Sequence, residues 1–147
     1  MKEINTYFID TNVFLRTLIK EDKNTFNDCL AFFEKVKNNK CKAVTASIVI
    51  AEVVWTLLSF YKVSKSEVIM AVNSIKNMRG LSIIDGYDIK TALQLFEDNN
   101  VKFIDCMIAS TKSVSKDKIT IVSFDKDFDK LGIARKEPKQ IASVLSL

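Results

Sequence analysis

Short apolar segments alternate with helical patterns along the chain, and this alternation constrains the possible folds most. Segments rich in β-branched and aromatic residues, typical of strands, occupy residues 4–9, 43–45, 81–84, 118–122 and 133–135. Apolar residues at helical spacing lie between them, over residues 26–36, 48–60, 68–75, 89–96 and 103–109. Apolar strands separated by helices are typical of a parallel sheet that helices cover on both faces. The sequence therefore predicts an α/β fold with a short parallel sheet flanked by helices.

No linker, repeat or shift in composition divides the chain. Its 147 residues are 48% hydrophobic and include only 3 Gly and 1 Pro. This length and composition suit one globular domain with its own core. We therefore expect a single domain over residues 1–147.

Several short motifs predict where helices begin and end. Ser47 is a candidate N-cap for the helix over residues 48–60, and residues 64–67 have the S-x-x-E form of a capping box. Asp85 or Asp88 starts the helix over residues 89–96, which ends at residues 99–100.

Composition removes several classes of chemistry. The chain has no histidine, which excludes Ser-His-Asp and Cys-His nucleophile pairs and imidazole acid/base catalysis. Its 3 cysteines form no CxxC pair, and no segment has the pattern of a signal peptide or a membrane span. We therefore expect a cytoplasmic protein without a membrane segment. A net charge of +4 is compatible with an anionic partner such as RNA.

Two aspartates follow apolar strand segments directly. Asp10 comes after residues 7–9, and Asp125 comes after residues 121–124. Open α/β sheets place their functional sites at the carboxyl ends of the strands. Each Asp taken alone is equally consistent with a helix cap or a turn, but two of them at the same sheet edge favour a site.

Two further carboxylates interrupt helices that are otherwise apolar. Glu52 lies within residues 48–58 and Asp105 within residues 101–109. Glu and Asp are rarely buried unless they are paired, because an unpaired buried carboxylate costs several kcal/mol in desolvation. A buried salt bridge or a narrow solvent-facing stripe would explain either residue alone.

A shared cation explains all four acids together. Two carboxylates about 4 Å apart repel by about 4 kcal/mol at an effective dielectric of about 20, so a cluster of Asp10, Glu52, Asp105 and Asp125 requires cations. Oxygen ligands without histidine favour Mg²⁺ or Mn²⁺ over zinc. Such a site polarises a phosphoryl oxygen and activates water, which indicates phosphodiester hydrolysis.

Four segments carry a resemblance to a known family. They read FIDTNVF at residues 8–14, SIVIAEV at 47–53, FIDCMIA at 103–109 and SFDKDF at 123–128. In this order and context they resemble the four acidic motifs of the PIN-domain ribonucleases, across nearly the whole chain. The length is similar to that of VapC-type toxins of type II toxin–antitoxin pairs.

The resemblance implies a three-layer PIN-like fold and a metal-dependent endoribonuclease. Asp10, Glu52, Asp105 and Asp125 would surround one or two Mg²⁺ ions, with Asp127 as a fifth candidate ligand. In our hypothesis Asp10, Asp105 and Asp125 hold metal while Glu52 orients or partly deprotonates the attacking water. The supporting residues would be Thr11 and Asn12, which can bond carboxylates or cap the next helix, and Ser123, which keeps the hydroxyl of the family's usual Thr.

Surface features suggest partners. Lys112, Lys116 and Arg16 are candidate contacts for an RNA backbone. The aromatic residues at positions 55, 60 and 61 fit a core or a subunit interface. The apolar content of residues 48–75 exceeds what one small core needs, which suggests a homodimer or a groove for an antitoxin's helix.

Two other function classes remain open on the sequence. A catalytically silent PIN-like module would bind RNA or a protein without cutting. A haloacid-dehalogenase-like phosphatase also starts with an Asp after its first strand, but it needs an acid two residues later, where this chain has Asn12.

Overall fold

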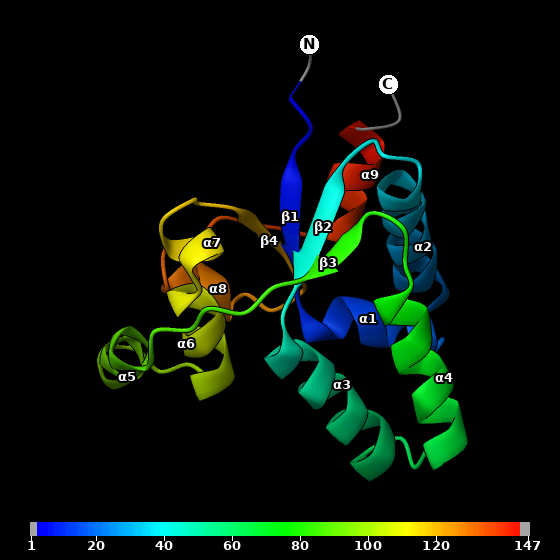
Figure 1. Ribbon diagram of the computed structural model, residues 1–147, viewed down its shortest axis with the longest axis horizontal. Coiled ribbons are helices and arrows are strands. Elements are labelled where there is room, and N and C mark those ends of the chain that lie inside the picture. Colours follow the sequence, from blue (N-terminus) through cyan, green and yellow to red (C-terminus); the bar gives the residue numbers. More distant parts are fainter. Residues whose placement is uncertain (1–2, 145–147) are drawn as a thin grey trace.

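A computed structural model describes residues 3–144 and contains a five-stranded parallel sheet (Figure 1). The central strand β1 pairs with β2 on one side and β4 on the other, where Phe8 lies opposite Val44 and Ile121. The sheet order is β3-β2-β1-β4-β5, which confirms the predicted α/β architecture. The strands are β1 (Thr6–Ile9), β2 (Lys42–Thr45), β3 (Leu81–Ile83), β4 (Thr120–Val122) and β5 (Arg135–Lys136).

Helices gather in two groups on either side of the sheet (Figure 1). One group contains α1 (Thr11–Leu18), α2 (Lys23–Lys37), α3 (Ser47–Ser59), α4 (Lys65–Lys76) and α9 (Pro138–Val144). The other contains α5 (Ile89–Asp98), α6 (Phe103–Ser110), α7 (Lys112–Ser115) and α8 (Asp127–Lys130). The sheet edge that bears the carboxyl ends of β1 and β4 therefore faces the space where the two groups meet.

The core forms where the central strands meet α2. Phe8 and Ile9 of β1 are fully buried, as are Phe32 and Val36 of α2. The rings of Phe14 and Phe33 stack with their centroids 5.6 Å apart. Burying one such aromatic side chain contributes about 2–3 kcal/mol. A smaller cluster of Ala92, Val101 and Cys106 joins α5 to α6.

The capping signals had mixed outcomes. The capping box of Ser64 and Glu67 is confirmed, as is Asp88, which accepts a hydrogen bond from the Thr91 amide at the start of α5. The prediction for Ser47 was wrong. Ala46 occupies the N-cap of α3 instead. The hydroxyl and the backbone amide of Ser47 both donate to the Asp85 carboxylate. Hydrogen bonds to a charged acceptor are stronger than neutral ones, which favours this arrangement.

The remaining differences concern short elements. The segment predicted as a strand over residues 118–122 enters the sheet only at Thr120, because Lys118 has a left-handed backbone with φ 54°. The last strand lies at Arg135–Lys136 instead of residues 133–135, and α7 and α9 were not predicted.

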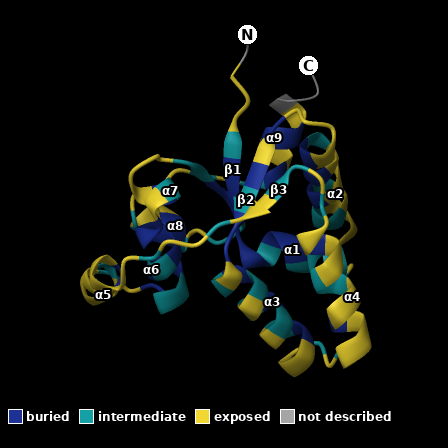
Figure 2. Cartoon of the chain, in the orientation of Figure 1, coloured by how far each residue is buried: buried dark blue, intermediate teal, exposed yellow. Residues whose placement is uncertain are grey.

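The exposed aromatic residues do not belong to the core. Trp55 is 67% exposed and Phe60 is 71% exposed, whereas Tyr61 packs partly against the core. Exposed positions also cover the outer faces of α4 and α5 (Figure 2). No helix in residues 3–144 has the length and apolarity that a membrane span requires.

Candidate metal centre

The carboxyl ends of β1 and β4 bring two of the predicted acids to one sheet edge. Ile9 lies opposite Val122 in the parallel ladder, and the Asp10 amide donates to the Val122 carbonyl oxygen at 3.1 Å. Asp10 therefore leaves the sheet beside Ser123, with Asp125 two residues further along. The prediction that both aspartates follow strand ends is confirmed.

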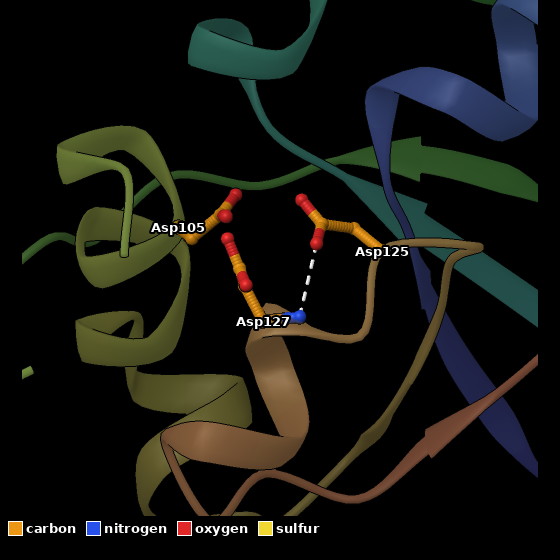
Figure 3. Close-up of side chains that lie close together, drawn as sticks. All are labelled: Asp105, Asp125 and Asp127. Atoms are coloured by element: carbon orange, nitrogen blue, oxygen red, sulfur yellow. Dashed lines mark hydrogen bonds between the residues drawn. The ribbon is translucent and has the colours of Figure 1, made fainter. Parts of the chain in front are cut away.

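Three carboxylates from two elements converge at this edge. Asp105 comes from the first turn of α6, Asp125 comes from the turn that leads into α8, and Asp127 is the first residue of α8 (Figure 3). One oxygen from each residue lies within 4.8 Å of the other two. The Asp127 amide donates to Asp125 Oδ1 at 2.9 Å, which fixes the turn that holds these two side chains beside Asp105.

Asp105 is the residue of this cluster whose hydrogen bonding is least satisfied by the protein. Its side chain is 2% exposed, and its Oδ2 atom has no hydrogen-bond partner within the described residues. Burial, reinforced by the charge of Asp10, raises the pKa of Asp105 to about 8. An orphaned buried oxygen beside two other carboxylates fits a hard divalent cation, which supplies the missing partner and favours the ionised form.

Asp10, in contrast, has its hydrogen bonds supplied by the protein. Asp10 Oδ2 accepts from the Ser123 hydroxyl at 2.6 Å and from Asn12 Nδ2 at 3.3 Å. Burial raises the pKa of Asp10 to about 6, although the Ser123 hydrogen bond favours the carboxylate. Asp10 occupies the N-cap of α1 without a side-chain capping bond, so capping does not explain its position.

Asn12 and Ser123 extend this network to the neighbouring loop. Asn12 Nδ2 donates to the Ser123 hydroxyl, and Asn12 Oδ1 accepts from the Phe124 amide at 3.2 Å. The Ser123 hydroxyl also accepts from the Asp125 amide at 2.9 Å. The two side chains therefore connect the end of β1 to the loop that carries Asp125. Thr11 differs, because its buried hydroxyl makes neither of the contacts predicted for it.

Glu52 lies near the three aspartates but outside their tight group. It projects from α3, is half-buried, and its charge raises the pKa of both Asp10 and Asp105, though less than burial does. Asp10 interacts in the same way with Asp105. Asp10 and Glu52 thus interact electrostatically with Asp105, which forms the closest group with Asp125 and Asp127.

Lys102 lies at the site but was not among the residues predicted for it. It occupies the N-cap of α6, three residues before Asp105, and its Nζ lies 3.3 Å from Asp125 Oδ2. The i, i+3 spacing of Lys102 and Asp105 was the available signal, since residues so spaced lie close together at a helix start.

The three candidate RNA contacts lie at different places. The Arg16 guanidinium pairs with Glu21 at 3.0 Å. Lys112 and Lys116 are exposed at the start and end of α7, which follows α6 directly. RNA contact by these residues stays a prediction.

The chain matches the family model of the PIN domain over residues 7–134. It is 29% identical to a VapC ribonuclease of Aquifex aeolicus (strain VF5), over 88% of this chain and 95% of that protein. The structure resembles VapBC2 from Rickettsia felis bound to a promoter DNA fragment (TM-score 0.65, 18% identity, 90% of this chain, 98% of that chain). It also resembles the sarcin-ricin-loop-cleaving toxin VapC20 of Mycobacterium tuberculosis (TM-score 0.62, 18% identity, 90% of this chain, 99% of that chain).

The chain therefore belongs to the PIN domain family, and the sheet flanked by helices is the fold of that family. This membership rejects the haloacid-dehalogenase-like alternative. The side chain at the position where such a phosphatase needs an acid, Asn12, instead donates a hydrogen bond to Asp10.

Proposed function

We propose that this protein is a metal-dependent endoribonuclease that hydrolyses RNA phosphodiester bonds. The observation that carries this proposal is the convergence of Asp105, Asp125 and Asp127 around a buried carboxylate oxygen without a partner. Oxygen ligands without nitrogen or sulfur favour Mg²⁺ or Mn²⁺. The name of the A. aeolicus relative, a ribonuclease, supports RNA as the substrate.

The acids divide between holding a cation and handling a proton. Asp10, Asp105 and Asp125, together with Asp127, would hold the ion. When bound, a divalent cation neutralises charge on the phosphoryl group and lowers the pKa of water. Glu52 comes from α3 and acts electrostatically on both Asp10 and Asp105, and we assign to it the orientation of the attacking water and acceptance of its proton.

Asn12 and Ser123 act on Asp10 and on the loop. Their hydrogen bonds favour ionised Asp10 against the effect of burial and restrain the backbone of Asp125. Residues that hydrogen-bond a metal-binding carboxylate fix its orientation and tune its affinity. We therefore assign to both a supporting role in the site.

The names of the relatives suggest a biological context. Two of them are VapC proteins and one structure is a VapBC complex. We infer that this protein is the cytoplasmic toxin of a type II toxin–antitoxin pair. An apolar groove of about 340 Å³ between α3 and α4, lined by Val54, Leu58, Val68, Ile69 and Val72, would accept an apolar helix of the antitoxin.

A homodimer is the second assembly that we propose. Trp55 on α3 is exposed, as are Ile89, Leu93 and Phe96 on α5. The two helices belong to different groups, and exposed apolar residues on each are typical of surfaces that a second subunit covers.

The test of the function is RNA cleavage with purified protein. A panel of structured and single-stranded RNAs is incubated with Mg²⁺, Mn²⁺ or EDTA, and wild type is compared with Asp105→Asn and Glu52→Gln. We expect cleavage only with metal and a loss of about 1000-fold in each variant, because several kcal/mol of transition-state stabilisation is removed.

Asp117→Asn is the matched control, since Asp117 is exposed in the loop before β4. It should cleave like wild type. Cleavage in EDTA, or full activity of Asp105→Asn, would contradict the proposal. RNA binding without cleavage under either metal would instead support the catalytically silent module.

A further inference from the structure

Lys102 places a positive charge at the solvent-exposed edge of the acidic cluster, beside Asp125. Its Nζ lies 3.3 Å from Asp125 Oδ2, while its side chain remains 62% exposed. Burial of the ammonium disfavours its charge, but Asp105, Asp125 and Glu52 outweigh that effect and raise the pKa of Lys102. Lys102 also acts electrostatically on Asp10. One lysine thus interacts with acids from β1, α3, α6 and the loop before α8.

Lys130 provides a useful contrast. Its Nζ lies 3.2 Å from Asp127 Oδ1, three residues earlier on α8, and its side chain is 58% exposed. The two lysines therefore have the same charge, similar exposure and an ion pair with one acid of the cluster. They differ in position, because Lys102 stands at the N-terminus of α6 among the acids of the other elements.

The ion pair of Lys102 conflicts with cation binding at Asp125. A divalent cation and an ammonium group repel each other, and an oxygen that ligates the cation is a poorer partner for lysine. The lysine stem is flexible and half-exposed, so its ammonium can leave Asp125 while α6 holds its Cα at the site. A lysine ammonium released at this place is a suitable partner for the phosphodiester of a bound RNA, since lysine side chains commonly contact phosphate oxygens of nucleic acids.

We propose that Lys102 is a catalytic residue that exchanges Asp125 for the scissile phosphodiester of RNA when Asp125 ligates a divalent cation. This inference rests on the proposed function and adds a residue to it. Before a cation binds, Lys102 neutralises part of the negative charge of the four carboxylates with which it interacts. After the cation and RNA have bound, the charge of Lys102 stabilises the negative charge that increases on the phosphoryl oxygens during hydrolysis.

The experiment compares Lys102→Met, Lys102→Arg and the matched control Lys130→Met in two measurements. The first is calorimetric titration with Mn²⁺ alone, without RNA. Lys102→Met should bind Mn²⁺ about tenfold more tightly than wild type, because a competing charge close to the ligand is removed. Lys130→Met should change the affinity less than about fivefold, the range of an exposed ion pair.

The second measurement is steady-state cleavage of an RNA that wild type cuts, at several salt concentrations. Lys102→Met should lose about 100-fold in kcat/KM, with a reduced kcat, as expected for loss of one charged donor to the transition state. The slope of log(kcat/KM) against log[salt] should also become shallower by about 0.7, the value for one phosphate contact to a single strand. Lys102→Arg keeps the charge and should retain most of the activity.

Each outcome decides the question. If Mn²⁺ affinity stays unchanged in Lys102→Met, or if its kcat and salt slope equal those of Lys130→Met, the exchange is wrong and Lys102 is an ordinary surface ion pair. If wild type cleaves no RNA, the proposed function fails and this inference fails with it. Thermal unfolding of each variant identifies a loss of activity that comes from misfolding.

Discussion

The two halves of the site differ in how completely the protein satisfies their polar groups. At the end of β1, Asp10 accepts hydrogen bonds from Asn12 and Ser123. On the α6 side, Asp105 is equally buried but has an oxygen without a hydrogen-bond partner among residues 3–144. The first half is a finished hydrogen-bond network. In the function that we propose, a cation bound by Asp105 supplies the missing partner of the second half and offsets the desolvation cost of the buried carboxylate.

The largest difference between the two halves should appear in how the stability of the protein depends on pH in EDTA. The pKa of Asp105 is raised to about 8 in the folded protein, from 3.8 ordinarily. A carboxyl whose pKa rises on folding binds more protons in the folded state, so it destabilises the fold increasingly from about pH 4 to about pH 8. We expect the metal-free protein to lose a few kcal/mol of unfolding free energy over this range.

Thermal unfolding at several pH values measures this loss. Asp105→Asn, which cannot ionise, should flatten the dependence and be more stable than wild type at pH 8 in EDTA. Mg²⁺ or Mn²⁺ should raise the melting temperature of wild type and not of the variant. If the melting temperatures of the two proteins depend on pH in the same way, Asp105 is not the carboxyl group whose pKa is raised by folding.

The hydrogen-bond network around Asp10 can be disrupted by a substitution at Ser123. Ser123→Ala removes the shortest hydrogen bond to Asp10 and the acceptor of the Asp125 amide. We expect a loss of about 10- to 100-fold in RNA cleavage or metal affinity, the usual effect of removing a residue that orients a ligand. Ser123→Thr keeps the hydroxyl and serves as the control in both assays. If alanine and threonine perform alike, the network does not orient the acids.

The smallest effect is expected at Thr11, which lies beside the Asp10 hydrogen-bond network but whose hydroxyl has no partner in the described part of the chain. Thr11→Val replaces an unsatisfied buried hydroxyl by a methyl group of similar size. The stability of the protein should stay unchanged or rise by up to about 1 kcal/mol, with normal cleavage. Urea unfolding measures this change. A loss of more than about 1 kcal/mol would reveal a hydrogen bond to bound water at this hydroxyl.

Much of the architecture could be predicted from local patterns. The alternation of apolar strands and helices, the capping box at Ser64 and the cap at Asp88 depend on neighbours in the chain, and the structure confirms them. The prediction of Ser47 as a cap failed because its partner, Asp85, is distant in sequence. Trp55 could equally have been a core or an interface residue, since a helix apolar on nearly every face does not reveal which face packs inward.

The sequence by itself determined which carboxylates are candidates for the site, because acids within apolar strands and helices conflict with burial unless they share a ligand. Only the tertiary structure decided how they divide. Hydrogen bonds from Asn12 of α1 and from Ser123 after β4 satisfy Asp10, while the turn before α8 brings Asp127 beside Asp105. It also decided that Lys102 stands among them. Distances between groups far apart in the chain depend on how strands and helices pack, and no local pattern encodes them.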